Sequence, residues 1–276
     1  MAAPAPMSPS SPAFPVIAGI PLEVVWHGPR PAEAPTLVFL HEGLGCVKMW
    51  RDFPARLAEA AGCGALVYSR AGYGQSGPAT LPRPTRYLHD EGLSVLPELL
   101  EALGVRDHIV IGHSDGGSIA LIYAGGAPRP GLRGVITEAA HVFNEPLSHA
   151  SIQAARIAYE TTDLRSKLAR FHRDVDHAFW GWNGVWLSDD FWTWNIEEYL
   201  PRIRVPLLVM QGEDDQYGTP AQVEAICSGA GGPAQKLLLP HCAHTPHREA
   251  PEATFTAMHA FVVEALEGSH SGPPAR

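Results

Sequence analysis

A serine between glycines is the first place in the sequence where chemistry can be expected. The segment from Gly112 to Gly116, with Ser114 at its centre, matches Gly-x-Ser-x-Gly, a pattern that presents a serine nucleophile on a tight strand-to-helix turn. Such a turn leaves no room for side chains beside the serine, which explains the flanking glycines. The match is informative because an apolar run, 108–113, precedes it and a helix is expected to follow.

A serine hydroxyl becomes a useful nucleophile when a base takes its proton and a carboxylate orients that base. The best candidate base is His244, on a loop after the last expected strand. The best candidate acid is Asp215, directly after the preceding strand, with Asp214 as the alternative. His241 and His247 are local competitors of His244, and we interpret them as supporting or surface residues.

Two other interpretations of these motifs are less favoured. A zinc site built from His241, His244 and His247, with Cys242, would need a defined geometry and supporting hydrogen bonds. The segment 72–77, GYGQSG, matches a dinucleotide fingerprint but continues into PATLPRP. Without a helix N-terminus nothing there would hold a pyrophosphate. We therefore expect no metal and no cofactor.

Composition narrows the class of protein. The chain has 276 residues, 45% hydrophobic and 18% charged, with a net charge of -9. This acidity argues against a nucleic-acid partner. The four cysteines lack C-x-x-C spacing, which indicates reduced thiols, and no apolar run is long enough for a membrane span. We expect a cytoplasmic monomer or homodimer, with disordered ends at 1–13 and 268–276.

Short apolar runs alternate with helix-like stretches along most of the chain, which predicts a mostly parallel, twisted sheet flanked by helices. The predicted strands are 36–41, 64–69, 108–113, 132–137, 206–211 and 235–240. The predicted helices are 51–61, 91–103, 116–124, 220–228 and 249–266. An antiparallel hairpin is expected over 14–28.

One interval, 141–200, lacks a good strand and contains five of the seven tryptophans. We interpret it as a helical, Trp-rich cap, inserted before the penultimate strand and lying over the edge of the sheet where α/β proteins bind ligands. The remaining segments, 14–140 and 201–267, form the predicted core domain.

The chain resembles the α/β-hydrolase superfamily over roughly residues 14–267. The acid usually follows a strand-ending glycine, as in the segment GEDD at 212–215, and the segment AHTPHREAPE at 243–252 follows the family's histidine motif closely. The segment SRAGYGQS at 69–76 resembles DRPGYGxS, with serine in place of aspartate. The resemblance implies the α/β-hydrolase fold and a triad of Ser114, Asp215 and His244.

Attack on an ester also needs hydrogen-bond donors for the developing oxyanion. One is expected to be the backbone N–H of Asp115, which follows the nucleophile. The resemblance places the other in the loop 41–46, on Gly43 or, alternatively, Leu44. Glu42 replaces the family's usual glycine there. Glu42 and Asp115 together either disfavour anionic substrates, or one of them is neutralised by Arg70 or His41.

The substrate pocket is expected to combine the oxyanion loop with aromatic residues of the cap, since such lids exclude water and shape the site. The candidates are His41, Glu42, Phe143, Tyr159, Trp180, Trp182, Trp186, Trp192 and Trp194. Two or three of the tryptophans are expected only to pack within the cap.

Together these features predict a serine hydrolase that cleaves a small, largely apolar carboxylic ester or lactone. The likeness is to enol-lactone hydrolases and small carboxylesterases. Thioester or C–C bond hydrolysis of the aromatic-degradation type is the main alternative, because relatives use the same triad for it. Cofactor-free oxygenase or lyase chemistry and a non-catalytic ligand receptor are further alternatives, since one fold hosts many functions.

Overall fold

A seven-stranded sheet forms the centre of the molecule, in a computed structural model that describes residues 10–268. The strand order is β3-β5-β4-β6-β7-β8-β9; β3 is antiparallel to β5, and the other pairs are parallel. All six predicted strands are present, each within one residue at either end. The strands are β3 (Val24–His27), β4 (Thr36–Leu40), β5 (Gly64–Tyr68), β6 (His108–His113), β7 (Leu132–Glu138), β8 (Leu207–Gly212) and β9 (Ala234–Leu239).

The N-terminal segment differs from the predicted hairpin. Only β1 (Val16–Ile17) and β2 (Ile20–Pro21) form a short antiparallel pair, whereas β3 joins the main sheet as its edge strand. Residues 10–13 of the predicted disordered leader are ordered, because the backbone amides of Ser10 and Ala13 donate hydrogen bonds to β3. The rest of that leader, and all of the predicted tail except Gly268, lie outside the described residues.

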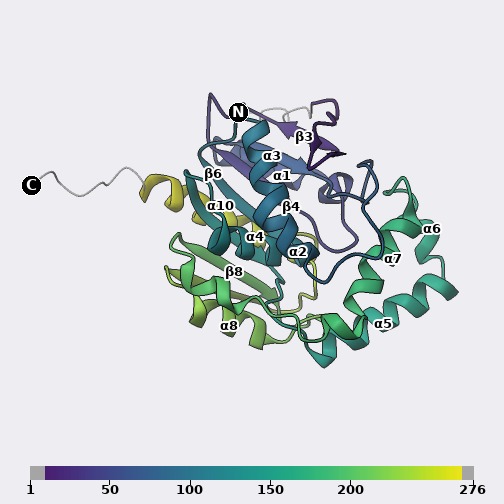
Figure 1. Ribbon diagram of the computed structural model, residues 1–276. Helices are drawn as coiled ribbons and strands as arrows, with labels where there is room; N and C mark the ends of the chain where they lie inside the picture. The colour runs from purple at the N-terminus through teal and green to yellow at the C-terminus, as the bar shows by residue number, and fades with distance from the viewer. Residues whose placement is uncertain (1–9, 269–276) are drawn as a thin grey trace, which may run out of the picture.

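Helices cover both faces of the sheet, which makes α/β layers (Figure 1). On one face, α1 (Phe53–Ala60) and α10 (Pro251–Glu267) pack on side chains such as Ile109 and Ile111. On the other face, α3 (Leu96–Ala102), α4 (Asp115–Gly126) and α8 (Pro220–Gly229) pack on residues such as Val110. Central strands are therefore apolar on both faces, as in other parallel sheets. The shorter helices are η1 (Val47–Trp50), α2 (Tyr87–Asp90), η2 (Glu91–Val95) and α9 (Pro246–Glu249).

A helical segment lies between β7 and β8, and α5, α6 and α7 stand together at one side of the molecule (Figure 1). Its elements are α5 (Pro146–Thr161), α6 (Leu164–Leu168), α7 (Val175–Trp186), η3 (Asp189–Phe191) and η4 (Glu197–Arg202). We call residues 146–202 the inserted segment. His172 fastens it to the core, since its Nδ1 accepts from the Gly74 amide at 3.0 Å and its Nε2 donates to the Leu44 carbonyl at 2.9 Å.

None of the helices within residues 10–268 combines the length and the apolar character that crossing a membrane requires.

Candidate active site

Ser114 stands on a strained turn between β6 and α4. Its φ of 53° and ψ of -116° lie in a region that non-glycine residues rarely adopt. The flanking glycines are required by contact: a Cβ on Gly112 would come within 2.1 Å of the Gly116 carbonyl oxygen, and one on Gly116 within 2.0 Å of the Leu40 carbonyl oxygen. The motif and its glycines therefore have the steric role that the sequence pattern indicates.

Three side chains from different loops meet at the carboxyl edge of the sheet, where parallel strands bring their C-terminal ends together. The Nε2 atom of His244 lies 2.9 Å from the Oγ of Ser114. The Nδ1 atom of the same ring lies 2.8 Å from the Oδ1 of Asp215. A neutral imidazole that donates from Nδ1 to the carboxylate accepts at Nε2. This arrangement can remove a proton from the serine hydroxyl.

Asp215 is buried and held in place by its own loop. Its Oδ1 accepts from the Tyr217 amide at 2.8 Å, and its Oδ2 accepts from the side chain of Gln211 at 3.2 Å. Burial opposes ionisation, but the hydrogen bond and charge of His244 outweigh it, so the pKa of Asp215 is lowered. Asp214 is exposed, and the carboxylate that reaches His244 is that of Asp215.

The two competing histidines lie elsewhere. His247 is buried, and its Nδ1 lies 2.9 Å from the Oε2 of Glu138, which also accepts from the His247 amide at 3.0 Å. Its ring packs on Trp50 with centroids 4.6 Å apart. His241 is exposed. Across residues 10–268, no three His, Cys, Asp or Glu side chains are grouped so that they could hold a metal ion.

Glu42 is paired with His113, which is neither of the two predicted partners. Its Oε2 lies 3.4 Å from the Nδ1 of His113. Burial alone would lower the pKa of His113, but the hydrogen bond and charge of Glu42 raise it to about 9. The pKa of Glu42 is lowered, because the His113 contact outweighs its burial. The two side chains thus form a charged pair whose net charge is zero.

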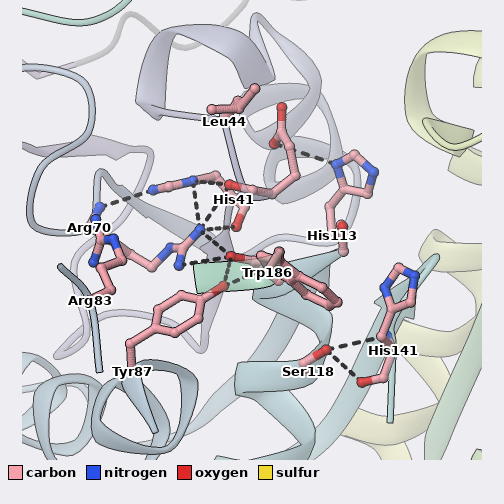
Figure 2. A network of polar contacts seen from close by, with 12 residues as sticks. His41, Leu44, Arg70, Arg83, Tyr87, His113, Ser118, His141 and Trp186 are labelled. Atoms are coloured by element: carbon pink, nitrogen blue, oxygen red, sulfur yellow. Dashed lines mark hydrogen bonds and ion pairs between the residues drawn. The ribbon is translucent and has the colours of Figure 1, made fainter. Parts of the chain in front are cut away.

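Asp115 is neutralised by Arg70, one of the two predicted candidates. Both terminal guanidinium nitrogens lie 3.4 Å from the Asp115 Oδ2, and the two side chains are 0% and 1% exposed. Burial opposes the charge of Arg70, but Asp115 and nearby groups raise its pKa overall. In Figure 2, Arg70, Tyr87 and Trp186 turn toward one another around this carboxylate. The acidic residue beside Ser114 therefore carries no unbalanced charge.

A cavity of about 100 Å³ opens beside the Ser114 hydroxyl. Its walls combine the loop after β4, the turn at Ser114 and the inserted segment, and they are largely apolar. The lining residues are Glu42, Gly43, Leu44, Ser114, Asp115, His141, Ser148, Ile152, Trp182, Trp186, Tyr217 and His244.

The expected oxyanion loop forms part of this cavity wall. Gly43 and Leu44 both line it, as does Asp115, the first residue of α4. The amides of a helix's first turn have no partner within the helix, which leaves the Asp115 N–H available. The indole of Trp182 lies against Gly43, where an added Cβ would come within 2.2 Å of its Nε1.

Two of the five tryptophans, Trp182 and Trp186, line the cavity. Trp192 is instead 48% exposed and contacts His149, and Trp194 is buried in a stack with Phe191. The tryptophans of the inserted segment therefore have different surroundings, because side chains along its helices and turns point in different directions.

Four other residues predicted to line the pocket also do not line the cavity: Tyr159, Trp180, Phe143 and His41. Tyr159 stacks on Phe179 and donates to Asp176 at 2.6 Å. Trp180 packs edge-on against Tyr159 at 5.6 Å, and the backbone of Phe143 pairs with that of Asn195.

His41 is fully buried behind the loop that carries Glu42. Its Nδ1 donates to the Glu42 carbonyl at 2.7 Å, and its Nε2 accepts from the Arg70 amide at 3.0 Å. Burial and the charge of Arg70 hold the pKa of His41 well below its ordinary value. The ring is therefore neutral and supports the backbone of the loop instead of facing the cavity.

Four lining residues were not predicted from the sequence: His141, Ser148, Ile152 and Tyr217. Ser148 and Ile152 could have been found from their spacing in the sequence. Ser148 and Ile152 are four apart on α5, so they share one helix face. Tyr217 follows Asp215 by two residues. His141 follows β7 with no pattern that marks it.

The sequence profile of the alpha/beta hydrolase family matches residues 37–257. The chain belongs to the alpha/beta hydrolase family.

Curated relatives within this family differ in activity. The chain is 25% identical over 265 residues to a 2-succinyl-6-hydroxy-2,4-cyclohexadiene-1-carboxylate synthase of Serratia proteamaculans, covering 84% of this chain and 94% of the relative. It is 30% identical over 210 residues to a putative carbamate hydrolase of Stutzerimonas stutzeri, covering 68% and 77% of the two chains.

Solved structures share the fold. An enol-lactonase of Burkholderia xenovorans superposes with a TM-score of 0.71 at 19% identity, over 91% of this chain and 100% of its own. A proline iminopeptidase of Mycobacterium smegmatis superposes with a TM-score of 0.70, also at 19% identity, over 94% and 100%. At such identities the likeness describes the fold alone.

Proposed function

We propose that this family member is a serine hydrolase that cleaves a small carboxylic ester or lactone. The observation that carries the proposal is the unbroken hydrogen-bonded chain from Ser114 through His244 to Asp215, with its serine end at the cavity. Both distances, 2.9 and 2.8 Å, are within the range for proton transfer.

In the first half of the reaction, His244 removes the proton from Ser114 as its Oγ attacks the substrate carbonyl carbon. Asp215 holds the ring so that Nε2 faces the serine, and it stabilises the imidazolium that forms. His244 then donates the proton to the departing alkoxide, which leaves an acyl group on Ser114. Water, deprotonated by His244, then attacks the acyl carbon. The bond from that carbon to the Ser114 Oγ breaks, His244 returns the proton to the Oγ, and the acid is released.

The oxyanion would be stabilised by backbone amides. The N–H of Asp115 is one donor at the helix N-terminus, and that of Gly43 or Leu44 is the other. The charges of Glu42 and Asp115 are balanced by His113 and Arg70, so neither carboxylate stands unpaired beside the developing negative charge.

The inserted segment would act as a cap that sets the size and polarity of the substrate. It contributes Ile152, Trp182 and Trp186 to the lining, and the core adds Leu44. A cavity of about 100 Å³ is small beside the roughly 300–1,000 Å³ of typical ligand pockets. We therefore propose a short, largely apolar acyl group, with the leaving group toward the opening.

The same site could act on other acyl bonds, and a substrate panel distinguishes them. The names of the relatives include a carbamate hydrolase and an enol-lactonase, and the same attack by Ser114 would open a thioester. A panel of small esters, a lactone, a carbamate and an acyl thioester therefore compares the classes by kcat/KM.

The deciding experiment combines labelling with substitution. A fluorophosphonate probe should label the wild-type protein on Ser114, and Ser114→Ala should lose labelling and about 10⁴-fold or more in kcat. Ser228→Ala is the matched control, because its hydroxyl donates to the Glu224 carbonyl, away from the cavity. Ester turnover that survives in Ser114→Ala would refute the assignment.

A further inference from the structure

The side chain of Asp115 joins the turn that carries Ser114 to the inserted segment. Its Oδ1 accepts from the Trp186 indole Nε1 at 3.2 Å, and its Oδ2 accepts from the Tyr87 hydroxyl at 2.8 Å. The same indole N–H lies 2.8 Å from the Tyr87 oxygen. Trp186 is thus held by two acceptors from the core, one of which is adjacent in sequence to Ser114.

This network is closed off from solvent. The side chains of Arg70 and Asp115 are at most 1% exposed, and Tyr87 and Trp186 are each 4% exposed. Buried hydrogen bonds face little competition from water, and leaving one unmade is costly. An indole has a single N–H donor, so the two acceptor oxygens fix the orientation of the ring.

The ring of Trp186 is one wall of the cavity. It meets the ring of His141 edge-on with centroids 5.5 Å apart, and that of Phe191 at 4.9 Å. Because the cavity is only about 100 Å³, a small movement of this ring changes a large share of the space beside Ser114.

We propose that Asp115 and Tyr87 are positioning residues that set the acyl length the enzyme accepts, by holding Trp186 against the cavity. The inference rests on the proposed ester hydrolysis. Arg70 supplies the counter-charge that lets a carboxylate occupy this position. Substrate selectivity is thereby coupled to Tyr87, a residue of α2 that does not line the cavity.

The cleanest test is Tyr87→Phe, which removes one oxygen and leaves the Arg70–Asp115 pair intact. With one hydrogen-bond acceptor removed, the Trp186 ring should move aside more easily and admit longer acyl chains. The ratio of kcat/KM for p-nitrophenyl hexanoate to that for the acetate should rise about tenfold, mainly through KM. Trp186→Phe should shift the ratio in the same direction. The double variant should shift it no further than Trp186→Phe, because both changes act through one contact.

Tyr159→Phe is the matched control. Its hydroxyl also donates to a carboxylate, that of Asp176, at 2.6 Å, and its side chain is equally buried but lies away from the cavity. It should leave the selectivity ratio unchanged. An unchanged ratio in Tyr87→Phe, or an equal shift in Tyr159→Phe, would overturn the proposal.

A second measurement separates this proposal from the proposed function. Urea unfolding of the wild type, Tyr87→Phe, Trp186→Phe and the double variant yields the coupling between the two residues without any substrate. We expect the two single losses of unfolding free energy not to add up in the double variant. This expectation holds even if the protein turns over no ester, a result that would refute the proposed ester hydrolysis but not the contact between Tyr87 and Trp186. Additive losses would refute the link between Tyr87 and Trp186.

Discussion

The Nε2 atom of His113 lies 2.7 Å from the backbone carbonyl oxygen of His244. The residue before the proposed nucleophile therefore holds the loop that carries the proposed base. The Nδ1 atom of the same ring lies 3.4 Å from the carboxylate of Glu42. A protonated imidazole carries an N–H on both nitrogens, so His113 joins the proposed oxyanion loop, through its ion pair with Glu42, to the loop that carries His244.

Raising the pH is expected to weaken this link and the fold with it. Burial opposes the charge on His113, yet Glu42 raises its pKa to about 9, above the ~6.5 of an unfolded histidine. The stabilisation is therefore complete below about pH 6.5 and is lost as the pH rises through about 9. Urea unfolding across that window should show a falling free energy of unfolding in the wild type. Glu42→Gln should flatten the dependence, and an equally steep fall in that variant would contradict the assignment.

Removing Arg70 should destabilise the protein strongly. Arg70→Met leaves Asp115 buried without its counter-charge, and breaking such a pair costs about 3–5 kcal/mol. Adding Asp115→Asn should restore part of the loss, since the unpaired charge is then gone. Arg133→Met, at the exposed pair with Asp107, is the control and should cost about 0–1 kcal/mol. Similar losses in the two single variants, measured by urea unfolding, would argue against a special role for Arg70.

Gly43→Ala should impair catalysis by collision with the inserted segment. The new Cβ would lie 2.2 Å from the Trp182 Nε1, so either the indole or the proposed oxyanion loop must move. We expect kcat/KM to fall by up to about 10²- to 10³-fold, the scale of losing one oxyanion donor. Combining Gly43→Ala with Trp182→Leu should recover part of the lost kcat/KM, because the smaller side chain leaves room for the new Cβ.

The control for this prediction is Gly184→Ala, on the same helix as Trp182 but with no atom within 4 Å of the added Cβ. It should keep full activity and gain up to about 1 kcal/mol of stability, because alanine favours helix. Equal losses of kcat/KM in both glycine variants would remove the steric explanation.

His247→Ala and His244→Ala should fail in different ways. His247→Ala leaves the buried carboxylate of Glu138 without its ring partner, so the loss is one of stability, about 1–3 kcal/mol for a buried acceptor that loses a hydrogen bond. His244→Ala should keep the fold and lose about 10⁴-fold in kcat. Melting temperature and kcat, measured well below the transition, separate the two. A folded His247→Ala protein without turnover would indicate that the roles of these histidines are reversed.

Much of the fold could be predicted from local sequence. Strands buried on both faces must be continuous apolar runs, so β6 and β8 were recognisable within one residue. The turn at Ser114 was also recognisable from its pattern. Gly112 is required by a backbone contact four residues away, whereas Gly116 faces the Leu40 carbonyl of the neighbouring strand β4. The N-terminal segment was harder, because the pairing of β3 with β5 depends on a partner about 40 residues away.

The order Ser114, Asp215, His244 and the position of each after a strand are properties of the chain alone. Parallel strands end at one edge, so the sequence already placed these side chains on neighbouring loops. Arg70 was a candidate partner in the sequence, and the structure assigns it to Asp115. The pairing of Glu42 with His113 and the direction of each tryptophan were not accessible in this way. His113 reaches Glu42, and Trp186 reaches Asp115, across separations of 71 residues. Such contacts depend on how loops and helices pack in three dimensions, and neither residue type nor spacing along the chain encodes that packing locally.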